Sequence, residues 1–134
     1  MIPINYVAVF IAAVLAMVSG FVWYSKAAFG KQWMRLTGVT EASAKAGNMP
    51  LLYGTMFVGA LVEAYVLSHF IHYAGAYSLI NGIKTGVWAW LGFVITTSLA
   101  NSMFEGRPIK LLYINAGYAL VNLMIMGAVL AVLW

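Results

Sequence analysis

The sequence contains no cysteine and very few charged residues. The absence of cysteine excludes disulfide bonds, thiolate metal ligands and cysteine nucleophiles. Charged residues make up 7% of the chain and apolar residues 64%, whereas a soluble domain usually carries about 25% charged residues. A chain with so little charge cannot cover a surface in water. The composition therefore predicts a single membrane domain over residues 1–134.

The basic residues are too few and too widely spaced for nucleic-acid binding. The formal net charge is +4, but recognition of nucleic acid needs a dense basic patch. Here the basic residues flank apolar segments, which is where membrane proteins place them. We expect membrane lipids as partners and no nucleic acid.

Long apolar runs are what the sequence has in abundance. Each run holds about 20 residues or more, enough to cross ~30 Å of hydrocarbon as a helix. The first run is uncharged and too long for a secretory signal, so we expect it to be a retained helix. The sequence predicts an all-α integral membrane fold, a four-transmembrane-helix bundle made of two hairpins. The four predicted helices span Ile4–Tyr24, Leu51–Tyr73, Thr85–Phe104 and Leu111–Trp134.

The predicted connections differ in length and character. Ala74–Gly82 and Glu105–Pro108 are expected to be short turns. The longer connection, Ser25–Pro50, contains a candidate amphipathic helix at about residues 26–37. In it Lys31 and Arg35 lie opposite an aromatic face, which suits a helix in the headgroup region; an ordinary loop with scattered aromatics is the alternative.

Helix caps mark several of the predicted boundaries. Asn5 is expected to cap the first helix, Gly38 to end the amphipathic segment and Thr40 to start a further short turn. Gly47, Asn48 and Pro50 are expected to precede the second membrane helix.

The basic residues predict the orientation of the four helices. One side of the membrane receives Lys84 alone. The other side receives Lys26, Lys31, Arg35, Lys45, Arg107 and Lys110. Positive charge stays in the cytoplasm, so both termini are predicted on the extracytoplasmic side of a bacterial inner membrane, with the chain multi-pass.

Short motifs spread over nearly the whole chain resemble one known family. They are Asn5, Trp23-Tyr24-Ser25, Phe29-Gly30-Lys31, Trp33, Leu36-Thr37-Gly38, Trp90-Leu91-Gly92-Phe93, Phe104-Glu105-Gly106-Arg107, Asn115, Gly117 and Tyr118. With these the sequence resembles the domain of unknown function 1761 family of small bacterial membrane proteins. The resemblance implies a four-helix membrane protein and implies no activity.

Glu63 is the most unusual residue, because it lies near the middle of the second apolar run. A charge at the bilayer centre costs from ~3 to over 10 kcal/mol, so this carboxyl should be neutral or satisfied by partners. Matching depths along the helices places Thr96, Thr97 and Asn122 level with it, as a polar intramembrane site. Three roles stay open: a titratable site in a proton or cation pathway, a hydrogen bond that holds helices together, and pairing with a basic residue of another chain.

Other polar residues suggest a second site and surface contacts. Asn101 and Asn115 are expected to bond each other. Asn115, Tyr118 and Asn122 share one helix face, as an interhelical polar seam or as the lining of a crevice. At the cytoplasmic side, contacts with lipid or a partner are expected from Lys31, Arg35, Arg107 and Lys110, with Glu105 and Arg107 forming a local ion pair.

No metal, cofactor or catalytic site is predicted. His69 and His72 lie three residues apart near the outer end of the second helix, without a third ligand at that level. Small-xxx-small patterns predict close helix packing at Gly82-xxx-Gly86, Gly92-xxx-Thr96 and Gly127-xxx-Ala131.

Two functions follow from these observations. The sequence favours a small non-enzymatic, homo-oligomeric transport or permeation protein whose polar site surrounds Glu63. The alternative is a structural or accessory subunit that packs against a larger membrane protein complex.

Overall fold

The computed structural model describes residues 2–134 and is all-helical over that range. Four helices are long and apolar enough to span a membrane, which indicates a membrane protein. The third of them is continuous but contains a π-helical segment, η1. The elements in chain order are α1 (Tyr6–Trp23), α2 (Gly30–Thr37), α3 (Glu41–Lys45), α4 (Met49–Ala74), α5 (Leu79–Ala89), η1 (Trp90–Ile95), α6 (Thr96–Glu105) and α7 (Ile109–Val132).

Side-chain caps fix where the helices start, as the sequence predicted. The carboxamide oxygen of Asn5 accepts from the backbone N–H groups of Val7 and Ala8 at 3.1 and 3.2 Å. Asn48 caps α4 through the Leu51 N–H, and Thr40 caps α3. These bonds satisfy donors that a helix start otherwise leaves open.

Two helix starts lie more than two residues from the sequence prediction, and the other boundaries shift by one or two residues. The third membrane helix starts at Leu79 instead of Thr85, because the Ser78 side chain caps it by accepting from the Asn81 N–H at 3.2 Å. The predicted turn at 74–82 therefore shrinks to a few residues, and Lys84 lies inside the helix. The amphipathic helix α2 starts at Gly30, after a tight turn in which a Cβ on Gly30 would lie 2.4 Å from the Tyr24 carbonyl oxygen.

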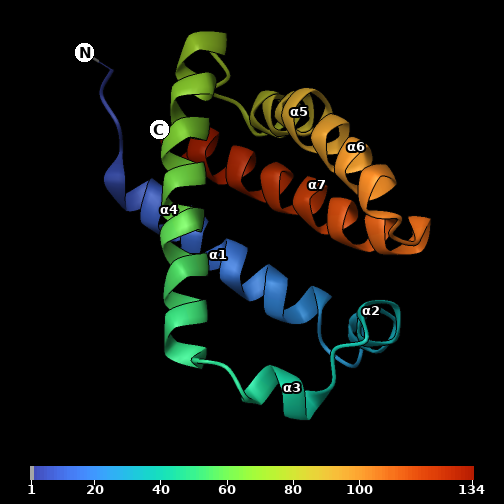
Figure 1. Ribbon diagram of the computed structural model, residues 1–134. Helices are drawn as coiled ribbons and strands as arrows, with labels where there is room; N and C mark the ends of the chain where they lie inside the picture. Colours follow the sequence, from blue (N-terminus) through green and yellow to red (C-terminus); the bar gives the residue numbers. More distant parts are fainter. Residues whose placement is uncertain (1) are drawn as a thin grey trace.

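α7 is the central helix of the molecule, and it packs against α1, α4 and α5 (Figure 1). The core on α1 and α4 consists largely of small side chains, which let the helix backbones approach closely. They are Ala8, Ala12, Ala13, Ala16, Ala60 and Ala64, and on α7 the side chains of Met126 and Leu130 are fully buried.

Glycine brings α5 and α7 together. A Cβ on Gly82 would lie 2.3 Å from the Gly127 carbonyl oxygen, and a Cβ on Gly86 would lie 2.3 Å from that of Leu123. The small-xxx-small prediction is thus confirmed at Gly82, Gly86 and Gly127. It is wrong at Gly92, where an added Cβ meets no atom within 4 Å.

Along the third span, contact with the rest of the molecule decreases from α5 to α6. α5 makes the most extensive helix contact with α7, whereas α6 makes far less contact with it. Figure 1 shows α6 running beside the first part of α7. The π-helical turn lies between the two, and such turns change the direction of a helix face because they insert a residue.

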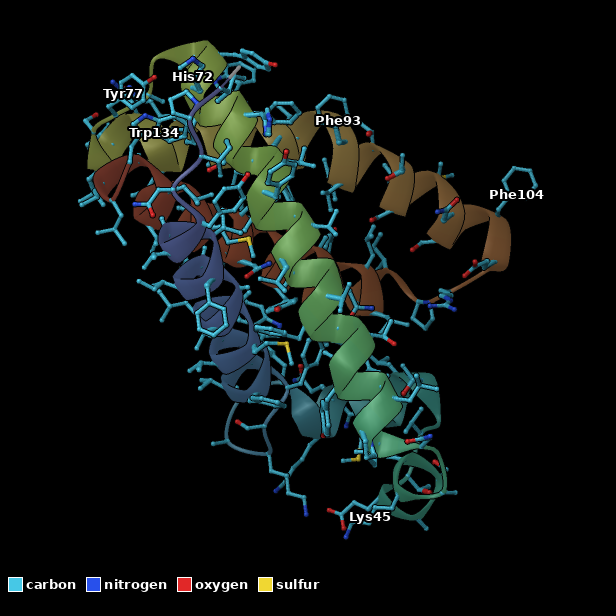
Figure 2. All side chains as sticks on the ribbon, turned by 90° about the vertical axis from the view of Figure 1, so that its left-hand side faces the viewer. Lys45, His72, Tyr77, Phe93, Phe104 and Trp134 are labelled. Carbon is cyan, nitrogen blue, oxygen red and sulfur yellow. The ribbon has the colours of Figure 1, made fainter. Side chains whose placement is uncertain are left out.

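Both described ends of the chain lie at the same end of the molecule. The Asn5 side-chain amide donates to the Leu133 carbonyl oxygen at 2.5 Å. In Figure 2, His72, Tyr77 and Trp134 cluster at this end, and Lys45 lies at the opposite end. The His72 ring stacks on Trp134 with centroids 5.3 Å apart, so α4 and the end of α7 are joined there.

Candidate functional site

Glu63 lies partly buried on α4 and contacts a single amide of α7. The Asn122 Nδ2 donates to the Glu63 Oε1 over 3.4 Å. The ion pairs among the described residues, Lys26–Glu41 and Arg107–Glu105, do not involve Glu63. The partner of this carboxyl is therefore a neutral amide, as depth matching predicted for Asn122.

The oxygen of this amide has no hydrogen-bond partner among the described residues. Asn122 is 5% exposed, and its Oδ1 is buried without a hydrogen-bond partner among residues 2–134. A carboxylate can only accept hydrogen bonds, whereas a protonated carboxyl also donates one. A protonated carboxyl is the kind of donor that this amide oxygen lacks.

A stripe of polar side chains on α7 extends from this pair toward the start of the helix, through Tyr118 to Asn115. The Tyr118 hydroxyl donates to the Ala16 carbonyl oxygen of α1 at 3.0 Å, and the Ser19 hydroxyl donates to the same oxygen at 3.0 Å. Gly20 makes room for the phenol, since a Cβ there would lie 3.0 Å from the Tyr118 hydroxyl. The Tyr118 hydroxyl is thus held by the backbone of a neighbouring helix.

The stripe ends in an aromatic cluster at the end of α1. The Tyr24 hydroxyl donates to the Asn115 Oδ1 at 2.7 Å, and the Trp23 Nε1 donates to the Ile114 carbonyl oxygen at 3.0 Å. The Trp90 Nε1, in η1, donates to the Ala116 carbonyl oxygen at 2.8 Å.

The sequence analysis used Trp23 and Tyr24 only as part of a family motif, and their bonds to α7 were missed. The indole N–H and the phenol hydroxyl were the features that could have indicated these bonds, because such groups usually have a hydrogen-bond partner when they are buried.

Thr96 and Thr97 are placed elsewhere than the sequence predicted. Both are exposed on α6, which packs against η1 and α7. Their hydroxyls donate to carbonyl oxygens of their own helix, those of Gly92 and Phe93, at 2.9 Å each. Depth matching gives the level of a residue but not the direction in which it points. Of the three predicted partners, Asn122 is the one whose contact with Glu63 the structure contains.

Asn101 is also separated from its predicted partner. The oxygen of Asn115 accepts from Tyr24 instead, and Asn101 lies on the wall of a cavity between α6 and α7 that Asn115 also lines. The cavity volume is about 220 Å³. The predicted polar residues Asn101, Asn115 and Tyr118 therefore divide between a seam toward α1, formed by Asn115 and Tyr118, and a cavity wall that includes Asn101 and Asn115.

The predicted basic contacts lie on exposed surfaces. Lys31 and Arg35 project from α2, which Trp33 holds against Tyr24 in an edge-to-face contact 5.9 Å between centroids. Lys110 is exposed at the start of α7. The predicted ion pair of Glu105 with Arg107 is confirmed, with 2.6 Å between Oε2 and Nε.

A further ion pair links the connection to α3. The Lys26 ammonium hydrogen-bonds to the Glu41 carboxylate, and this bond and its positive charge lower the pKa of that carboxyl.

The two histidines lie near the end of α4 and bond to nearby groups. The His72 Nδ1 is 2.9 Å from the Tyr77 hydroxyl, and the His69 Nδ1 is 2.9 Å from the Tyr65 carbonyl oxygen. Within residues 2–134, no three or more His, Asp or Glu side chains group closely enough to hold a metal ion.

Comparison with known proteins bears on the family and leaves the activity open. The model of a family described as "Protein of unknown function (DUF1761)" matches residues 7–131. No curated protein and no solved structure matches the chain. The matched range runs from the first turn of α1 into the last turn of α7, and it includes the motifs from Trp23 to Tyr118 that suggested the resemblance. The chain therefore belongs to the DUF1761 family.

Proposed function

We propose that the protein is a small, non-enzymatic transport or permeation protein that works as a homo-oligomer and moves protons or cations through a path that includes Glu63. One observation carries the proposal: an ionisable group in a helix long enough to span a membrane is hydrogen-bonded to a neutral amide whose oxygen is buried without a partner among residues 2–134. Ionisable residues inside membranes are costly, and where they occur they often mark ion paths and proton relays.

The surroundings of Glu63 support a proton better than a larger cation. Stable binding of a metal cation needs several oxygen ligands, whereas the Glu63 carboxylate is hydrogen-bonded to one amide nitrogen among the described residues. A proton needs only the carboxyl and an acceptor. The Tyr118 and Ser19 hydroxyls on the neighbouring helices add polar groups between Glu63 and the end of α1.

The test is proton flux in liposomes. Purified protein is reconstituted with a pH-sensitive dye inside, and a potassium gradient with valinomycin drives protons inward. We expect flux above protein-free liposomes, and Glu63→Gln should abolish it because the amide cannot exchange a proton. Glu41→Gln, which removes an exposed carboxylate of α3, is the matched control and should keep the flux. Equal flux from wild type and Glu63→Gln would refute the pathway.

A second candidate is an accessory subunit of a membrane complex, and the third span favours it. The most apolar 18-residue window of Leu79–Glu105 contains no buried residue, in contrast to 22–44% for the other spans. Trp88 and Phe93, on this span, are 71% and 68% exposed. If liposomes show no flux and a defined complex co-purifies in mild detergent, this candidate replaces transport.

A further inference from the structure

The cavity between α6 and α7 is a second polar site, separate from Glu63. It has a volume of about 220 Å³ and lies beside the turn that joins the two helices. Figure 1 shows α6 and α7 converging at that turn. Its polar wall consists of Ser98, Asn101, Ser102, Glu105, Arg107 and Asn115.

The polar groups on this wall have unused hydrogen-bonding capacity. Thr96 and Thr97, just before them on α6, donate to carbonyl oxygens of their own helix. Among the described residues, the side chains of Ser98, Asn101 and Ser102 form no such bond, although hydroxyls in a helix commonly do. The Asn115 oxygen is occupied by Tyr24, which leaves its amide N–H groups free. The cavity thus offers donors and acceptors to an occupant.

The charges at the mouth of the cavity are balanced. Arg107 and Glu105 are 55% and 53% exposed and touch through Nε and Oε2. That contact leaves the terminal guanidinium nitrogens and the second carboxylate oxygen available. A simple anion would meet the Glu105 carboxylate, and a simple cation would meet Arg107. A molecule that carries both charges side by side matches both groups.

The cavity wall extends along two turns of α6. Ser98 and Glu105 both line the cavity and lie seven positions apart, which corresponds to about 10 Å of helix. Glu105 borders the turn that joins α6 to α7, and Ser98 lies farther along the helix from that turn. The side chains of Leu111 and Leu112, 3% and 5% exposed, add apolar surface to the same cavity. The site therefore has a charged mouth and a less polar interior.

We propose that this cavity binds a zwitterion in which a primary ammonium stands near an anionic oxygen group. Glu105 accepts from the ammonium, and Arg107 together with the Asn115 amide donates to the anionic oxygens. Two sources supply this chemistry, namely the phosphoethanolamine headgroup of a lipid and a free α-amino acid. The proposal does not depend on proton flux through Glu63.

Binding to the purified wild-type protein tests the ligand class directly. Delipidated protein in detergent is titrated by native mass spectrometry with phosphatidylethanolamine, phosphatidylcholine and phosphatidylglycerol of identical acyl chains. Equilibrium dialysis with labelled glycine tests the free amino acid. We expect phosphatidylethanolamine to bind at least ~10-fold more tightly than phosphatidylcholine, whose ammonium has no N–H to donate to a carboxylate. Glycine binding without lipid selectivity would assign the site to amino acids.

Three substitutions locate the site. Glu105→Gln and Arg107→Gln should each remove the preference, and Ser98→Leu should block binding by filling the cavity. Lys84→Gln removes an exposed charge of α5 that does not line the cavity and should keep the preference. Equal binding of the three lipids together with no glycine binding would overturn the proposal, and so would a preference for phosphatidylglycerol. The comparison of lipids and glycine on the wild-type protein tests the proposal even if a variant fails to fold.

Discussion

At the scale of single residues, the most unusual feature of the molecule is the contact of Glu63 with Asn122. The carboxyl accepts from the Asn122 amide, and the amide oxygen is buried without a partner in the described chain. A buried polar group that loses its partner costs about 1–3 kcal/mol, whereas replacing both partners by apolar groups of similar shape is often nearly neutral. The pair can therefore be tested as a unit.

We expect Asn122→Leu to lower the free energy of unfolding by about 1–3 kcal/mol, because Glu63 then has no amide donor in its site. Glu63→Leu combined with Asn122→Leu should recover most of that loss. Unfolding by sodium dodecyl sulfate in mixed micelles, followed by circular dichroism, measures both. If the single variant is as stable as the wild type, the hydrogen bond contributes nothing to the fold. Recovery of stability without recovery of flux would separate the structural role of the pair from its proposed function.

At the scale of elements, the helix caps and the membrane helices were predictable from the sequence, because each depends on residues that are close together in the chain. Asn5, Asn48 and Thr40 cap helices because their side chains reach N–H groups two or three residues away. The four apolar runs were long enough to identify the membrane helices by length alone. Neither inference requires knowledge of what lies next to the helix.

What the sequence did not predict depends on neighbouring helices. The third membrane helix starts at Leu79 because Ser78 caps it, but Asn81-Gly82 has the composition of a turn. Gly82 lies inside the helix, and the Gly127 backbone packs closely on it. The π-helical turn at Trp90–Ile95 changes the direction in which later side chains point. Thr96 and Thr97 follow this turn, and both are exposed with their hydroxyls bonded to their own helix, which depth alone could not reveal.

The contact of α5 with α7 gives a prediction at this scale. Gly82→Ala should destabilise the protein by about 1–3 kcal/mol, because its Cβ would meet the Gly127 carbonyl oxygen and the packed helices must move apart. Gly59→Ala on α4 is the matched control. An added Cβ there meets no atom within 4 Å, and alanine is the better helix former by up to ~1 kcal/mol. Unfolding in mixed micelles measures both variants. Equal stability of Gly82→Ala and wild type would contradict the close contact.

At the scale of the whole molecule, the two ends differ in charge and in kind of contact. One end joins Asn5 to Leu133 and stacks His72 on Trp134. The other end carries α2, α3 and Lys45 (Figures 1 and 2). This separation agrees with the distribution of basic residues along the sequence, in which Lys84, near the start of the third span, is the one basic residue assigned to the opposite side. Basic residues near short loops are retained in the cytoplasm.

The orientation in the membrane follows as the last prediction. Because the chain lacks cysteine, a single introduced thiol reports on one position alone. In intact bacterial cells we expect a membrane-impermeant maleimide to label Tyr77→Cys, in the connection between α4 and α5, and to leave Lys45→Cys unlabelled until the membrane is opened. Both sites are exposed and lie at opposite ends of the molecule (Figure 2), so accessibility in the folded protein is matched. Labelling of Lys45→Cys in intact cells, with Tyr77→Cys protected, would reverse the orientation. It would also place the cavity between α6 and α7 on the outer side, where its ligand would come from the outer leaflet or the periplasm.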